Sequence, residues 1–66
     1  MHKELVEWLV EFHEFDEKRA EKYVKSILKE AVELIEIGQW FTARNLINNA
    51  FESETLYTDL FNEGYL

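Results

Sequence analysis

The sequence predicts an all-α fold, a small bundle of four helices in a single domain that spans residues 1–66. Three observations predict it. Apolar residues recur every three or four positions along the chain, which is the spacing of one helix face. No segment alternates between apolar and polar residues for long enough to form a strand. The chain has no proline and only two glycines, Gly38 and Gly64, which fall where helices are expected to end.

The first helix is expected over about residues 3–14, where glutamates separate the members of an apolar row. That row is Leu5, Trp8, Leu9 and Phe12. The second is expected over 17–37, because Asp16 can cap its first turn and Gly38 can end it. Its core positions are Ala20, Val24, Ile27, Leu28, Ala31, Leu34 and Ile35. No glycine or proline enforces the break near Asp16, so one continuous helix over 3–37 stays open, and it would favour a dimer.

The third helix is expected over about residues 40–52 and the fourth over 55–63, with Ser53 or Thr55 as the cap of the fourth. On both sides of Gly38, small and large apolar residues alternate at helical spacing, which is typical of two helices that cross closely at a tight turn. The apolar row of the fourth helix is Leu56, Leu60 and Phe61. The sequence therefore predicts a tight helical hairpin at the centre of the bundle.

The expected core draws on all four helices. Its members are Trp8, Phe12, Val24, Ile27, Leu28, Ala31, Leu34, Trp40, Ala43, Ile47, Ala50 and Leu60. A chain of 66 residues buries only about 60% of the surface of its unfolded form, and 47% of these residues are hydrophobic. Surplus apolar surface therefore predicts a homodimer, through the first or fourth helix. Ala43 is the position where a large side chain is expected to unfold the chain.

The hairpin resembles one helical hairpin of the tetratricopeptide family. The residues that carry the resemblance cover about a third of the chain and are Ala31, Leu34, Gly38, Trp40, Ala43, Ile47 and Ala50. The proline that often closes such a repeat is absent, Thr55 stands near its place, and only one unit is present. The resemblance implies binding of a protein or peptide and no catalysis.

The charge of the chain limits its partners. The formal net charge is −7, which disfavours direct binding to nucleic acid or to an anionic membrane. No apolar run approaches the roughly 18 residues that span a bilayer, and Glu4 and Glu7 interrupt the N-terminal region where a secretory signal would be apolar. We therefore expect a cytoplasmic protein.

The residue types used in catalysis and metal binding occur here in no recognisable arrangement. Without cysteine there is no disulfide or thiolate metal site, and neither His2 nor His13 stands at the Glu-x-x-His spacing of a di-metal bundle. Glu30, Glu33 and Glu36 recur at helical spacing and read as a solvated flank. We expect no catalytic residue, no metal site, no cofactor and no enzymatic activity.

Four of the seven basic residues fall on one line of the second helix, at i, i+4, i+7 and i+11: Lys18, Lys22, Lys25 and Lys29. This lysine stripe lies opposite the expected core positions. It can be a solvated face supported by pairs such as Glu21 with Lys25. It can also dock an acidic partner, including the first helix of another copy of this chain.

The third helix carries a second candidate surface. Asn45, Asn48 and Asn49 share one side of it, although asparagine is a poor helix former. Phe41 and Arg44 stand beside them, and an aromatic next to an arginine is typical of an interface anchor. The alternative is that Phe41 packs on the first or fourth helix. The C-terminal Tyr65 and Leu66 can fold back or stay available to a partner.

Two functional hypotheses follow. The first is a small non-enzymatic interaction module, an adaptor or regulator that binds a larger protein. The second is an acidic inhibitor of the kind that phages or mobile elements encode, which mimics nucleic acid to block a host nucleic-acid-binding protein. Its acidic surface would be formed by Glu4, Glu7, Glu11 and Glu14. Binding of an adaptor is expected to resist salt, whereas binding of a mimic is expected to weaken steeply with salt.

Overall fold

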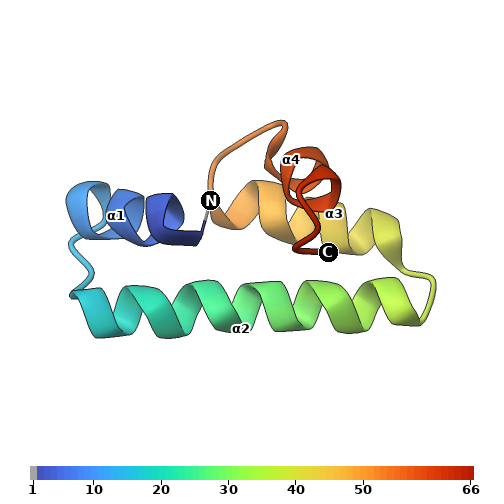
Figure 1. Ribbon diagram of the computed structural model, residues 1–66, viewed down its shortest axis with the longest axis horizontal. Helices are drawn as coiled ribbons and strands as arrows, with labels where there is room; N and C mark the ends of the chain where they lie inside the picture. Colours follow the sequence, from blue (N-terminus) through green and yellow to red (C-terminus); the bar gives the residue numbers. More distant parts are fainter. Residues whose placement is uncertain (1) are drawn as a thin grey trace.

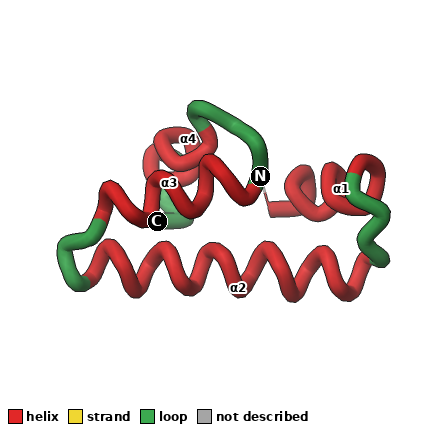
Figure 2. The backbone as a smooth tube through the Cα atoms, turned by 180° about the vertical axis from the view of Figure 1, so that it is seen from behind, coloured by secondary structure: helices red, strands yellow, loops and turns green. Residues whose placement is uncertain are grey.

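Four helices account for most of the computed structural model, which describes residues 2–66. They are α1 (His2–Phe12), α2 (Glu17–Glu36), α3 (Trp40–Ala50) and α4 (Leu56–Asn62). Helix α2 runs the length of the molecule, and α1 and α3 lie end to end along the same side of it (Figure 1). Helix α4 packs on the side of α3 that faces away from α2 (Figure 2). The prediction of a small all-α four-helix bundle is confirmed.

The chain breaks between α1 and α2, so the continuous helix over residues 3–37 is excluded. Glu14 has a φ of 57°, a left-handed conformation that ends the helical path. Asp16 then caps α2, because its Oδ1 accepts a hydrogen bond of 2.8 Å from the backbone N–H of Arg19. The predicted cap is confirmed. Helix α1 ends at Phe12, earlier than expected, because the chain then leaves the helical path to form the turn that contains Glu14.

The turn between α2 and α3 is a Schellman motif centred on Gly38. The φ of Gly38 is 81°, its N–H donates to the Ile35 carbonyl at 3.0 Å, and the N–H of Gln39 donates to the Leu34 carbonyl at 2.8 Å. These bonds satisfy carbonyls that the end of α2 would otherwise leave unpaired. The tight hairpin is thus confirmed. Ala31 and Ala43 are completely buried, as expected where two helix backbones approach closely.

The core is centred on α2, and half of the expected residues are buried in it. These are Val24, Ile27, Ala31, Ala43, Ile47 and Leu60. Four others are partly buried against them: Trp8, Leu28, Leu34 and Ala50. The core also buries Ala20, an expected core position of the second helix, and members of the expected apolar rows: Leu5, Leu9 and Leu56. Val6 and Phe51 complete it.

The prediction was wrong for Phe12 and Trp40, which are 65% and 55% exposed. The buried face of α1 is centred between Leu5 and Val6, so Phe12 falls on its flank at the last residue of the helix. Trp40 is the first residue of α3 and lies at the turn of the hairpin, beyond the end of α2. Both aromatic rings therefore lack a neighbouring helix that could cover them.

The loop before α4 and the C-terminus each fold on local hydrogen bonds. Thr55 occupies the N-cap position of α4 without a side-chain cap hydrogen bond, and Ser53 Oγ instead accepts from the backbone N–H of Thr55 and of Leu56, at 3.2 and 3.1 Å. At the other end, the N–H of Tyr65 donates to the Leu60 carbonyl at 3.0 Å. Leu66 folds back against the core, whereas Tyr65 stays exposed.

An aromatic junction joins α1 to the end of α3. Its centre is Phe51, whose ring lies 6.2 Å from the Trp8 ring and 6.1 Å from the Tyr23 ring. The His13 ring lies tilted against the Trp8 ring, with centroids 4.5 Å apart, and its Nε2 is 3.0 Å from Glu52 Oε2. Helices α1 and α3 have no extended contact of their own, so these side chains hold them together.

Candidate interaction surfaces

The first candidate surface lies at the α2–α3 turn, at one end of the molecule (Figure 2). We call it the aromatic tip and define it as Ile37, Trp40, Phe41 and Arg44. Ile37 is 72% exposed and Phe41 is 56% exposed, so the alternative in which Phe41 is covered by another helix is wrong. Three large apolar side chains are thus gathered in solvent at one turn.

The side chains of the aromatic tip support one another. The Trp40 and Phe41 rings meet edge to face, with centroids 5.8 Å apart. The Arg44 guanidinium carbon lies 5.5 Å from the centre of the Phe41 ring, which is the geometry of a cation–π contact. Because α3 fixes the backbone of all three residues, the tip is held in one arrangement before any partner arrives.

The three asparagines of α3 do not act together. Asn48 Oδ1 accepts from the N–H of Tyr57 at 3.0 Å, and its Nδ2 donates to the Glu54 carbonyl at 3.3 Å. Asn48 therefore fastens the α3–α4 loop and the start of α4, and its amide is not free for a partner. Of the three asparagines, Asn45 and Asn49 are exposed. A fold-specific hydrogen bond explains why a poor helix former stands at position 48.

We expect Asn48→Ala to lower the free energy of unfolding by about 1–2 kcal/mol, because two hydrogen bonds to the loop are lost. Urea denaturation followed by circular dichroism measures the change. The matched control is Asn49→Ala, which removes an exposed amide from the same helix and should change stability by no more than about 0.5 kcal/mol. Equal effects of the two variants would contradict the role assigned to Asn48.

The lysine stripe covers the outer face of α2. All four side chains are exposed, and they lie opposite the buried row of Ala20, Val24, Ile27 and Ala31. None of them makes an ion pair within 4.0 Å in the described part of the chain, so the expected pair of Glu21 with Lys25 does not form. The stripe therefore presents four ammonium groups without a carboxylate of their own molecule.

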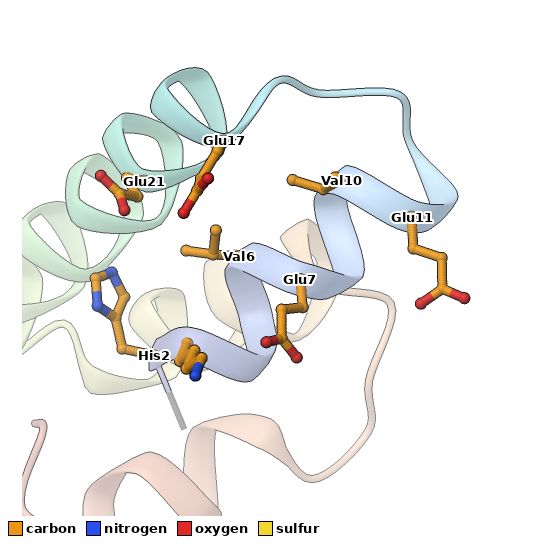
Figure 3. Close-up of a pocket in the computed structure, with 8 residues that line it drawn as sticks. His2, Val6, Glu7, Val10, Glu11, Glu17 and Glu21 are labelled. Atoms are coloured by element: carbon orange, nitrogen blue, oxygen red, sulfur yellow. The ribbon is translucent and has the colours of Figure 1, made fainter.

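A groove of about 590 Å³ runs between α1 and the first turns of α2 (Figure 3). Val6 and Val10 lie between the two helices, and Glu17 and Glu21 project from α2 towards them. Glu7 and Glu11 of α1 also line it, together with His2 and Lys3. We call this the acidic groove. Sequence reasoning missed it, although Val6 and Val10 form an i, i+4 pair beside the main apolar row of the first helix.

The acidic row expected on the first helix is exposed but only partly helical. Glu4, Glu7 and Glu11 lie in α1, on the side away from its buried face, whereas Glu14 belongs to the turn before α2.

Nowhere in residues 2–66 do three or more metal-binding side chains group in a way that could hold an ion. Among the described helices none has the length and apolar character needed to cross a membrane.

Comparison of the chain with protein-family models, with curated proteins and with solved structures finds no match. The functional argument therefore depends on the chemistry of these three surfaces: the aromatic tip, the lysine stripe and the acidic groove. The three surfaces lie in different parts of the fold, and each is accessible in a single copy of the molecule.

Proposed function

We propose that this protein is a small, non-enzymatic interaction module of the cytoplasm, an adaptor or regulator that binds a larger protein through the aromatic tip. The observation that carries the proposal is the exposure of Ile37, Trp40 and Phe41 at a single turn, while the rest of the hairpin is tightly packed. Large apolar side chains that cluster in solvent mark interaction sites in soluble proteins. No cofactor is required for this role.

The composition of the aromatic tip is that of an energetic centre for binding. Tryptophan, tyrosine and arginine dominate the residues whose truncation weakens protein interfaces most, and the tip contains Trp40 and Arg44. The contact of Arg44 with the Phe41 ring restricts both side chains, so less entropy is lost when a partner binds. The resemblance of the hairpin to the tetratricopeptide family, which binds proteins and peptides, supports the same role.

A second candidate function is the acidic inhibitor that mimics nucleic acid. It is favoured by one feature, the row of Glu4, Glu7 and Glu11 on the outer side of α1, which continues into Glu14. A partner that normally binds phosphates would meet this row through its own basic residues. Its complex would dissociate as salt screens the charges, whereas an apolar contact at the tip would persist.

Phe41→Ala is expected to weaken binding of the partner about 30-fold or more, as truncation of a central interface residue does. Tagged wild-type protein and Phe41→Ala are used to capture partners from a lysate of the source cells at about 0.1 M and about 0.5 M salt, a range over which surface charges become screened. The affinity of the partner retained by the wild type is then measured for both proteins.

The matched control is Phe61→Ala, which removes a ring that is 54% exposed on α4, away from the α2–α3 turn. Supporting results are a partner that binds wild type and Phe61→Ala at both salt concentrations and loses affinity for Phe41→Ala. A partner that is lost at high salt and binds Phe41→Ala as tightly as the wild type would favour the acidic inhibitor over the adaptor. Equal losses for both phenylalanine variants would contradict a binding site at the tip.

A further inference from the structure

We propose that the protein forms a homodimer in which the lysine stripe of each copy lies along the acidic groove of the other. This inference concerns a surface separate from the aromatic tip and does not depend on the function proposed for the tip. The occupant of the groove is a second copy of this chain, because the chain itself carries the complementary element.

Charge complementarity is the first argument. Four carboxylates line the groove, those of Glu7, Glu11, Glu17 and Glu21, against the one ammonium group of Lys3, so the lining is negative on balance. The stripe presents four ammonium groups that have no ion-pair partner in residues 2–66. Two copies of a protein with net charge −7 repel each other in most orientations. The stripe holds four of the seven basic residues, so an orientation that places the stripe of one copy on the groove of the other brings opposite charges together and replaces repulsion by attraction.

The interior of the groove suits lysine in particular. Val6 and Val10 lie between the helices, and the carboxylates of Glu17 and Glu21 project towards them from α2, whereas Glu7 and Glu11 point outward from α1 at the rim (Figure 3). A lysine side chain has an apolar stem of four carbons and a charged end, so it can cover the valines and still reach a carboxylate. Val10 is 41% exposed in the single copy and is the apolar surface that such stems would bury.

The two elements also match in length. Lys18 to Lys29 extends about 16 Å along α2, and His2 to Glu11 extends about 14 Å along α1, at 1.5 Å per helical residue. His2 lines the groove, and its Nε2 is a buried atom without a hydrogen-bond partner within residues 2–66.

The positions of stripe and groove on α2 favour a closed dimer. Glu17 and Glu21 directly precede Lys18 and Lys22, so the two surfaces are neighbouring sides of one helix, about 100° apart. One two-fold axis can then place the stripe of each copy on the groove of the other. Such a pairing forms two equivalent sets of contacts and leaves neither surface free to add a third copy.

Charge reversal tests the pairing. Sedimentation equilibrium at about 0.05 M and about 0.5 M salt is run on wild type, Lys22→Glu and Glu21→Lys, each first checked for helical content by circular dichroism. We expect the wild type to dimerise at low salt, and each single variant to raise the dimer dissociation constant about tenfold or more. The matched control is Glu63→Lys, the same change of charge beyond the end of α4, which should leave the dimer intact.

Mixing the two variants is the decisive experiment. A heterodimer of Lys22→Glu with Glu21→Lys has opposite charges at both sets of contacts, so the mixture should recover most of the lost affinity. A monomeric wild type at low salt, or a mixture that stays monomeric, would overturn the proposal. A dimer whose dissociation constant is unchanged by either charge reversal, but which is lost in Phe41→Ala, would also overturn the proposal. That result would place self-association at the aromatic tip. A monomer that binds a synthetic lysine-rich helix, and loses it in Glu21→Lys, would overturn the second copy as occupant.

Discussion

Replacing Ala43 with tryptophan is expected to prevent the chain from folding. Ala43 is completely buried on α3, as is Ala31 on α2. The Schellman turn at Gly38 fixes the distance at which the two helices leave the hairpin, so they cannot separate to admit an indole ring. Insertion of even a few methylene groups into a packed core costs about 1–3 kcal/mol, and an indole is much larger. A domain of 66 residues has roughly 3–10 kcal/mol of stability in total.

Circular dichroism and a thermal melt measure this effect, because a chain that does not fold loses its helical signal and its cooperative transition. Thr42→Trp is the matched control, since it adds the same ring at the exposed neighbouring position on α3. That variant should melt as the wild type does. A cooperative melt of Ala43→Trp close to the wild-type temperature would show that α2 and α3 are not closely packed at this point.

Phe51→Ala is expected to lower the free energy of unfolding by about 3–5 kcal/mol, which is a large part of the stability of so small a domain. Phe51 is only 4% exposed and contacts the rings of Trp8 and Tyr23, so its removal leaves a cavity at the aromatic junction. The loss also separates α1 from the end of α3, where His13 and Glu52 meet.

Urea denaturation of Phe51→Ala, compared with Phe41→Ala, tests the contribution of the junction. Phe41 is an exposed ring on α3, the helix that Phe51 directly follows, so its truncation should change stability by about 0.5 kcal/mol or less. This comparison also shows whether any loss of partner binding by Phe41→Ala comes from unfolding. Similar stability of the two variants would contradict the assignment of Phe51 to the core and Phe41 to the surface.

Much of the fold could be predicted from sequence because the signals that define it are local. The period of 3.6 residues identifies the helices, Asp16 needs only the N–H of Arg19 to act as a cap, and Gly38 needs only its own left-handed conformation. Burial is different, because it depends on which helix lies opposite. Phe12 and Trp40 continue apolar rows, yet each lies at a helix end that no other helix covers.

The surfaces could be predicted only where one helix carries all their residues. The lysine stripe is set by spacing along α2, and all four of its side chains are exposed in the structure. Asn48 shows the opposite case, since the partners of its amide, Tyr57 and Glu54, are defined by how the chain turns after α3. The acidic groove likewise exists only after α1 folds back on α2, and no pattern within either helix specifies that pairing.

The arrangement of α1 has a consequence for how the native state fluctuates. Among the helices of residues 2–66, α1 packs on α2 alone, and the aromatic junction ties it through the Trp8 ring to Phe51, just beyond the end of α3. Helices α2, α3 and α4 keep all their mutual packing if α1 lifts off. The amide hydrogens of α1 can therefore exchange with solvent through a local opening, whereas those in the middle of α2 exchange only when the whole domain unfolds.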